Sequence, residues 1–386
     1  MSIEGPRSIR PDEFPELGTL LNRAFRPNMT GNMADEFPVL LNAQNAQNLI
    51  IIRDGERILS HVGMLFRQAV LEGVGLKMAL VGSVATAEEA RERGYATSLL
   101  NASLDRASRV GMHLAWISGG RGLYINRGAT AVGRLWRFTV PAGREDAGSD
   151  LRELREEDLP AMSALHRREP IRLLRTMDDW RATFRTRWIM NGPGRFWGIW
   201  RDGRLAAYLA VRAPWQSGKP AMVVEYAGDR AAAAAAAPAI ASRMNMPALA
   251  ATVWPEDSTG RRAFEAVAAS AEETFTSGTM LLLNMAGCME ALRLRMMECI
   301  GREFASGLRF SESGRGPGVP EGRTDRLRIE RGAEHVEIIG RDEAARFLFG
   351  GKGYPDLPAH EGSAALLEAL RPALPLPAPW YGLDYC

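Results

Sequence analysis

A short segment of the chain combines arginine, glycine and small residues in a pattern suited to binding an anion. Arg91, Gly94 and Ala96 follow an apolar strand pattern and precede a helical pattern over Thr97 to Val110. A loop entering a helix presents unpaired backbone N–H groups and the positive end of the helix dipole. Small residues allow close approach of the backbone, and Arg91 and Arg93 add positive charge. The spacing therefore predicts a phosphate site.

This segment is neither of the two common glycine-rich nucleotide loops. It lacks the GxxxxGK[ST] pattern, and it lacks GxGxxG after a βαβ start, because the preceding elements read as a hairpin. The alternative is an arginine-rich helix start in which Gly94 is an ordinary turn residue.

Two copies of one strand and helix pattern position this loop. Ile9 to Pro15 is similar to Leu154 to Pro160, and hairpins around Asp54-Gly55 and Asp202-Gly203 follow in the same order. The further matches are a third strand at Met78 to Val84 and Met222 to Tyr226, and then Trp116 and Trp254. Each copy reads as a mixed α/β sheet domain. The second copy is shorter where the first has Glu88 to Ala96. Chance similarity of α/β patterns is the alternative.

The rest of the chain predicts a third domain. At about 150 residues per domain, 386 residues indicate two or three domains. Residues 143–151 read as a linker between the copies. Met289 to Phe304 predicts an amphipathic helix, Leu327 to Ile339 two strands, and Asp342 to Leu348 and Ser363 to Leu370 two helices. The division is 1–145, 146–284 and 285–386.

The segment Arg91-x-x-Gly94-x-Ala96 after Val84-Ala85-Thr86 resembles the pyrophosphate loop of GNAT acyltransferases. The resemblance implies acetyl-CoA as co-substrate, with no metal. Backbone groups of residues 84–86 would pair with the pantetheine arm, and amides of residues 92–97 would hold the pyrophosphate. The cofactor residues so implied are Val84, Ala85, Thr86, Glu92, Arg93, Gly94, Tyr95, Ala96, Thr97, Gly119 and Gly120.

A tyrosine shortly after the fourth strand often faces the thioester in GNAT enzymes. Tyr124 follows the strand ending at Trp116-Ile117, and a phenol can protonate a thiolate leaving group. The second copy has no tyrosine at the corresponding place, Thr259 to Phe264. Tyr124 is therefore the candidate general acid; alternatively, it is a core aromatic residue.

The whole chain resembles the Eis (enhanced intracellular survival) family: two tandem GNAT folds with mixed, mostly antiparallel sheets, the second degenerate, and a sterol-carrier-like C-terminal α/β domain. The resemblance implies that the terminal carboxylate, here on Cys386, reaches the first domain as general base. Three aromatic residues in the final segment, Trp380, Tyr381 and Tyr385, favour docking of the tail over disorder. Packing for stability alone is the alternative. A terminal cysteine departs from the usual aromatic or aliphatic residue.

The resemblance implies an N-acetyltransferase that acts on a primary amine of a small polycationic or lysine-like substrate, and a homo-oligomer, a hexamer in family members. Asp35 and Glu36 could attract a cationic substrate or belong to an ordinary helix start. The tryptophans of the second copy could wall a substrate cleft or pack in its core. Other functions remain open, namely an acyl-CoA-binding protein without catalysis and a lipid-binding protein acting through the C-terminal domain.

Composition excludes several other classes. Hydrophobic residues make up 46% and charged residues 24%, which is typical of a globular chain. The 48 basic and 46 acidic residues give a net charge of +2, so we expect no nucleic-acid partner. Cys288, Cys299 and Cys386 form no disulfide or metal pattern. The absence of a signal-like N-terminus and of a long apolar run predicts a cytoplasmic protein without a membrane partner.

Overall fold

The computed structural model describes residues 3–28, 31–143, 150–314, 316, 324–351 and 354–385. The chain forms two compact units, each built from separate stretches of sequence. Unit 1 combines residues 1–133 with 276–378, and unit 2 combines residues 134–275 with 379–385. The predicted linker residues 144–148 lie outside the described residues.

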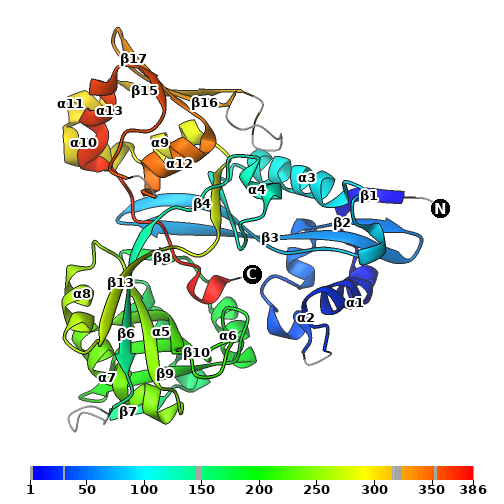
Figure 1. The fold of residues 1–386 in the computed structure, drawn as a ribbon, viewed down its shortest axis with the longest axis vertical. Coiled ribbons are helices and arrows are strands. Elements are labelled where there is room, and N and C mark those ends of the chain that lie inside the picture. The colour runs from blue at the N-terminus through cyan, green and yellow to red at the C-terminus, as the bar shows by residue number, and fades with distance from the viewer. Residues whose placement is uncertain are drawn as a thin grey trace. The chain divides into compact units, whose positions relative to one another are not determined.

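The sheet of unit 1 carries a parallel pair of strands beside antiparallel hairpins. Its order is β1-β2-β3-β4-β5-β14, with β4 and β5 parallel and the other neighbours antiparallel. Figure 1 shows helices α1 and α3 on opposite sides of this sheet. The elements are β1 (Ile3–Ser8), α1 (Phe14–Phe25), α2 (Met33–Glu36), β2 (Leu49–Asp54), β3 (Arg57–Leu71), β4 (Val74–Thr86), α3 (Tyr95–Arg109), β5 (Leu114–Ile117), α4 (Gly122–Ile125) and β14 (Thr279–Leu282).

Unit 2 repeats this order of strands. Its sheet runs β7-β9-β10-β11-β12-β6-β13, and β11 and β12 form the parallel pair. The elements are β6 (Arg134–Pro141), β7 (Asp150–Glu153), α5 (Leu159–His166), β8 (Ile171–Leu173), α6 (Met177–Thr186), β9 (Gly194–Arg201), β10 (Arg204–Arg212), β11 (Ala221–Gly228), α7 (Arg230–Arg243), β12 (Ala248–Val253), α8 (Ser258–Glu265) and β13 (Ser270–Phe275). The predicted α/β class with mixed sheets is confirmed.

Two strands belong to the unit that the sequence order would not suggest. Strand β6 follows the first repeat but pairs with β12 and β13 of unit 2, and β14 follows the second repeat but pairs with β5 of unit 1. The compact units therefore part at residues 133 and 275, before the predicted limits at 145 and 284. Sequence similarity locates repeats, whereas strand pairing decides which sheet an edge strand joins.

The C-terminal part of unit 1 holds a smaller antiparallel sheet, β15-β16-β17-β18. The single helix predicted over Met289 to Phe304 is wrong. The structure has three short helices there, because Gly301 takes φ +92° and ends the second. The elements are α9 (Met285–Ala291), α10 (Arg293–Ile300), α11 (Arg302–Ser306), β15 (Leu308–Ser313), β16 (Arg326–Arg331), β17 (Glu334–Ile339), α12 (Arg341–Phe349), β18 (His360–Gly362) and α13 (Ala364–Leu370).

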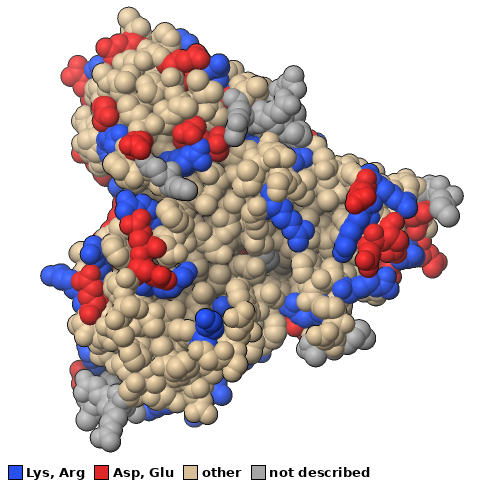
Figure 2. Space-filling model, in the orientation of Figure 1, with Lys and Arg blue, Asp and Glu red and all other residues tan. Residues whose placement is uncertain are grey.

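The face of the molecule drawn in Figure 2 carries charges of both signs. Figure 2 shows basic and acidic side chains interspersed over the visible face, as the near-zero net charge leads one to expect. Among the described residues, no helix is both long and apolar enough to cross a membrane.

Candidate active site

A bulge in β4 opens one end of the unit 1 sheet. Strands β4 and β5 pair only from Met78 to Val81, while β4 continues to Thr86. In between, Ser83 adopts φ +48° and the register with β3 shifts. A bulge bends its strand and increases the local twist. The last residues of β4 therefore turn away from the parallel pair and leave room beside it.

The buried side chain of His61 lies behind this bulge. Its Nε2 is 3.2 Å from Ser83 Oγ, and the ring is fully buried. Burial lowers the pKa of His61 to about 3, against a smaller opposing effect of a backbone hydrogen bond with Ile50. The ring is therefore neutral at pH 7 and supports the bulge without adding charge.

The loop after β4 ends at a helix N-terminus that is free to bind an anion. Gly94 is the N-cap of α3 with φ +76°, and Glu92 also has positive φ. The first-turn N–H groups of Tyr95, Ala96 and Thr97 have no carbonyl one turn earlier to pair with. Buried side chains, Leu99 among them, hold the other face of α3 against the sheet. The dipole of α3 thus points into the space beside β4.

Strand end, loop and helix together line a cavity of about 560 Å³. This volume lies within the range of small-molecule sites. Arg91 and Arg121 give the lining two cations against one carboxylate, Glu92. The lining residues are Ala24, Phe25, Val84, Ala85, Thr86, Ala90, Arg91, Glu92, Gly94, Tyr95, Ala96, Thr97, Arg121 and Leu123. The donors and the charge suit a phosphate ester, and the strand edge suits an amide-bearing chain.

The structure brings together most of the residues proposed for the cofactor. Val84, Ala85, Thr86, Glu92, Gly94, Tyr95, Ala96 and Thr97 line the cavity. Arg93, Gly119 and Gly120 are not part of this lining. The carbonyl of Gly119 instead accepts a hydrogen bond of 2.8 Å from Thr279 Oγ1.

Sequence reasoning missed the cavity residues supplied by α1, Ala24 and Phe25. The end of a helix far away in the sequence gives no local signal of such a role. Arg121 and Leu123 were also missed, although both lie within three residues of the predicted general acid, Tyr124.

The two proposed catalytic residues have different outcomes. Tyr124 lies in α4 with 4% of its surface exposed and belongs to the apolar core with Leu99 and Ile117. It does not line the cavity, although its neighbours Arg121 and Leu123 do. Burial raises the pKa of Tyr124, with a smaller opposing effect of Arg121, so its hydroxyl is protonated at pH 7. Cys386 lies outside the described residues.

Three other candidates for substrate recognition already have partners in the structure. Glu36 forms an ion pair with Arg26, and Asp35 accepts a hydrogen bond of 2.8 Å from Asn32. In unit 2, Trp180 is 2% exposed and packs edge-on against His166 and Tyr208, so it is a core residue. Within the described parts of the chain, no group of three or more His, Cys, Asp or Glu is placed to hold a metal ion.

The second repeat has no counterpart of the anion loop. Strand β11 ends at Gly228, and only Asp229 separates it from α7. The Asp229 carboxylate caps α7 by accepting a hydrogen bond of 2.9 Å from the Ala232 amide. A capping carboxylate satisfies one of the first-turn amides and repels a second anion. Unit 2 therefore lacks the feature that makes the cavity of unit 1 suitable for a phosphate.

Comparison with known proteins gives a family match within the first repeat. Residues 6–130 match the family model described as an acetyltransferase (GNAT) domain. The first repeat therefore matches an acetyltransferase domain, and the prediction of an acetyltransferase is confirmed at that level. No curated protein sequence matches the chain.

Solved structures share the fold over nearly the whole chain. A probable N-acyltransferase from Enterococcus faecalis is 14% identical with a TM-score of 0.68, covering 98% of this chain and 99% of its own. A GCN5-related N-acetyltransferase from Anabaena variabilis is 13% identical with a TM-score of 0.65 and the same coverage. Eis1 from Mycobacterium abscessus is 12% identical with a TM-score of 0.61, covering 99% of both chains. At these identities the likeness concerns the fold.

Proposed function

We propose that the protein is an acetyl-CoA-dependent N-acetyltransferase of the Eis type that acetylates a primary amine of a small polycationic or lysine-like substrate. The observation that carries this proposal is the cavity of unit 1, where the end of β4 and the N-terminus of α3 meet around Gly94. The second repeat is then a degenerate GNAT fold, and the C-terminal part is a sterol-carrier-like domain.

Different residues of the cavity bind different parts of the co-substrate. The first-turn amides of α3 and the Arg91 guanidinium face the pyrophosphate. The edge of β4 from Val84 to Thr86 pairs with the amides of the pantetheine arm and directs the thioester toward the bulge. Holding the thioester and the amine together supplies much of the rate enhancement.

Transfer of the acetyl group needs two proton transfers. The C–N bond forms when the neutral amine attacks the thioester carbonyl, and the terminal carboxylate of Cys386 takes the proton that the amine loses. A backbone N–H near Val84 stabilises the oxyanion. The C–S bond then breaks, and Tyr124 protonates the thiolate. No further reactant is needed.

The first test combines binding and turnover with a matched pair of glycine variants. Gly94 and Gly111 flank the same helix with φ +76° and +77°, and a Cβ at either would meet nothing within 4 Å. Alanine is strained at both positions, by about 1 kcal/mol. We expect Gly94→Ala to raise the Kd for acetyl-CoA about tenfold, because relaxing the strain turns the helix amides away. Gly111→Ala should change this Kd less than about twofold.

Calorimetry measures the binding, and release of CoA thiol with a panel of polyamines measures turnover. Equal effects of the two variants on acetyl-CoA binding would contradict the proposed site. The position of Tyr124 outside the cavity lining favours a second candidate, an acyl-CoA-binding protein without catalysis. Wild-type protein that binds acetyl-CoA but acetylates no amine would support that candidate.

A further inference from the structure

The second repeat contains the same kind of opening between strands as the cavity of unit 1. Strands β11 and β12 pair only from Ala221 to Val223, while β11 continues to Gly228. The register between β10 and β11 shifts at Val224, so β11 carries a bulge directly after the paired residues. The bulge and the parting of the two strands match those of β4 and β5.

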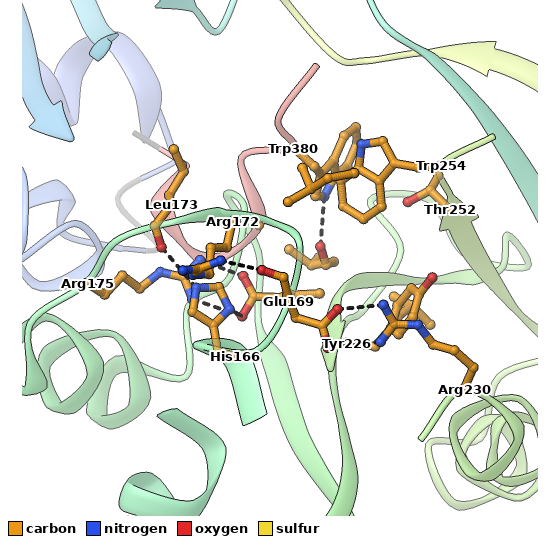
Figure 3. A pocket seen from close by; sticks show the side chains of 15 residues that line it. His166, Glu169, Arg172, Leu173, Arg175, Tyr226, Arg230, Thr252, Trp254 and Trp380 are labelled. Atoms are coloured by element: carbon orange, nitrogen blue, oxygen red, sulfur yellow. Dashed lines mark hydrogen bonds and ion pairs between the residues drawn. The ribbon is translucent and has the colours of Figure 1, made fainter. Parts of the chain in front are cut away.

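The C-terminal segment of the chain fills this opening. Trp380 Nε1 donates a hydrogen bond of 2.7 Å to the carbonyl of Val224, the bulged residue. Trp380 lines, together with Thr252 and Trp254, a cavity of only about 40 Å³ (Figure 3). That is room for a few water molecules at most. Leu383 packs in the core of the same unit.

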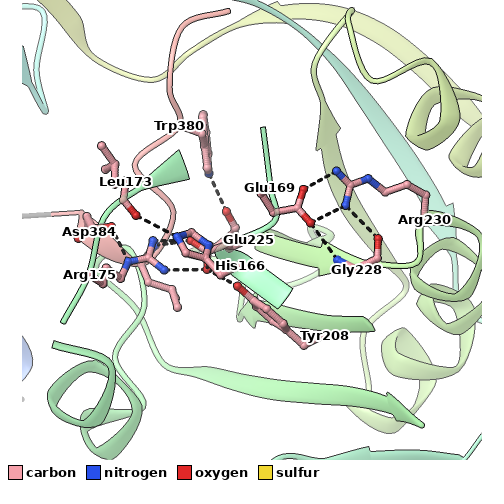
Figure 4. Close-up of polar contacts among 12 residues, drawn as sticks. His166, Glu169, Leu173, Arg175, Tyr208, Glu225, Gly228, Arg230, Trp380 and Asp384 are labelled. Carbon is pink, nitrogen blue, oxygen red and sulfur yellow. Dashed lines mark hydrogen bonds and ion pairs between the residues drawn. The ribbon is translucent and has the colours of Figure 1, made fainter. Parts of the chain in front are cut away.

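Buried charges fix the segment at its far end. Arg175 Nε donates to Asp384 Oδ2 at 2.6 Å, and its two terminal nitrogens donate to Glu225 at 2.9 and 2.5 Å (Figure 4). The Arg175 side chain is 3% exposed and that of Asp384 2%. One guanidinium thus bridges a carboxylate of β11 and a carboxylate of the C-terminal segment.

Neighbouring groups complete the arrangement around Glu225. The Tyr208 hydroxyl donates to Glu225 at 2.7 Å, and His166 Nδ1 lies 3.7 Å from the same carboxylate. Burial alone would raise the pKa of Glu225, but the Arg175 charge and these contacts outweigh it and lower the pKa to about 2. Burial and the Arg175 charge lower the pKa of His166. Without Arg175, the two carboxylates of Glu225 and Asp384 would lose the buried guanidinium that bridges them, which is strongly unfavourable.

We propose that the second repeat is a receptor for the chain's own C-terminal segment, and that Arg175 is the positioning residue that, through Asp384, sets where the terminal carboxylate lies. A chain extends at most about 3.6 Å per residue, so fixing Asp384 limits how far the end of the chain can reach. The catalytic consequence of this inference rests on the proposed function. The docking of the segment does not.

The experiment compares three variants of the full-length protein. Asp384→Asn removes the charge of the segment and leaves the Arg175–Glu225 pair in place, so unit 2 keeps its fold. Arg175→Met removes the anchor. Arg230→Met is the matched control, because Arg230 forms equally short ion pairs with Glu169 and Asp257 in the same unit and bonds to none of the tail residues in the described part of the chain.

Hydrogen exchange followed by mass spectrometry reports on residues 379–385. We expect exchange of this segment to become at least about tenfold faster in Asp384→Asn and Arg175→Met, and to stay within about twofold of wild type in Arg230→Met. Unchanged exchange in both tail variants, or equally fast exchange in Arg230→Met, would overturn the inference.

Kinetics separate this inference from the proposed function. Asp384→Asn should lower kcat at least about tenfold and leave the KM for acetyl-CoA within about twofold, since a displaced base slows chemistry and not co-substrate binding. Arg175→Lys should restore part of the loss caused by Arg175→Met. If the tail is released and kcat is unchanged, the receptor stands and the proposed base fails.

Discussion

The sequence predicts that two arginines of the loop after β4 add positive charge, but the two side chains lie in different places. Arg91 lines the cavity of unit 1 and Arg93 does not, although only one residue, Glu92, separates them. A phosphate held by an arginine gains a charge-assisted hydrogen bond, which is about twice as strong as a neutral one. The two side chains should therefore contribute unequally to acetyl-CoA binding.

We expect Arg91→Met to raise the Kd for acetyl-CoA about tenfold and to make binding less sensitive to salt. Arg93→Met changes the charge of the loop by the same amount and should raise the Kd less than about threefold. Calorimetry at two salt concentrations measures both effects. Equal losses in the two variants would mean that general attraction, rather than contact with Arg91, provides the binding energy.

The proposed role of Tyr124 as general acid can be tested directly, because its side chain is buried and does not line the cavity. Tyr124→Phe should lower kcat about 100-fold with little change in the KM for acetyl-CoA, because the ring does not line the cavity. Tyr226→Phe removes another buried hydroxyl, which bonds to Asp257 in unit 2, and should leave kcat unchanged. Initial rates of CoA release measure both. A Tyr124→Phe enzyme with full kcat would reduce Tyr124 to a core residue.

At the scale of the elements, the pairing of strands is what the sequence did not predict. Asp-Gly turns predicted both hairpins, and small residues before a helix pattern predicted the loop, because these signals are local. The placement of β6 and β14 in different sheets depends on pairing between strands that are distant in the sequence. No residue within either strand predicts that pairing. Phe25 enters the cavity for a similar reason, since α1 is positioned by contacts with β3 and β4.

The buried histidine behind the bulge of β4 should make the stability of the folded protein depend on pH. His61 has its pKa lowered by burial to about 3, whereas an unfolded chain titrates near 6.5. The unfolded state therefore binds the extra proton first. The stabilisation of the folded state is complete above about pH 6.5 and is lost as the pH falls toward 3, by about 1.4 kcal/mol per pH unit.

His61→Gln should flatten this slope between pH 6 and 4, while His335→Gln, a change at an exposed histidine of β17, should not. Urea unfolding at several pH values measures the slope. Parallel pH profiles for wild type and His61→Gln would show that other groups cause the acid sensitivity.

At the scale of the whole molecule, the chain divides its proposed tasks between units that each need distant parts of the sequence. The cavity lining belongs to unit 1 and contains no residue after Leu123 in the described chain. The segment from Pro379 to Tyr385 belongs to unit 2. Binding of acetyl-CoA and placement of the C-terminal carboxylate should therefore be separable by truncation.

A chain ending at Ala378 should bind acetyl-CoA within about twofold of the full-length Kd but lose at least about 100-fold in kcat. Unit 2 should melt about 5 °C lower or more, because Arg175 and Glu225 lose the buried Asp384 partner. A chain ending at Asp384 keeps that anchor, so it should melt close to the full-length protein and still lose kcat, since the terminal carboxylate has moved. Calorimetric melting and CoA release distinguish these effects. Full kcat in the chain ending at Asp384 would exclude the carboxylate of Cys386 as the general base, whereas full kcat in the chain ending at Ala378 would exclude any part of the tail from catalysis.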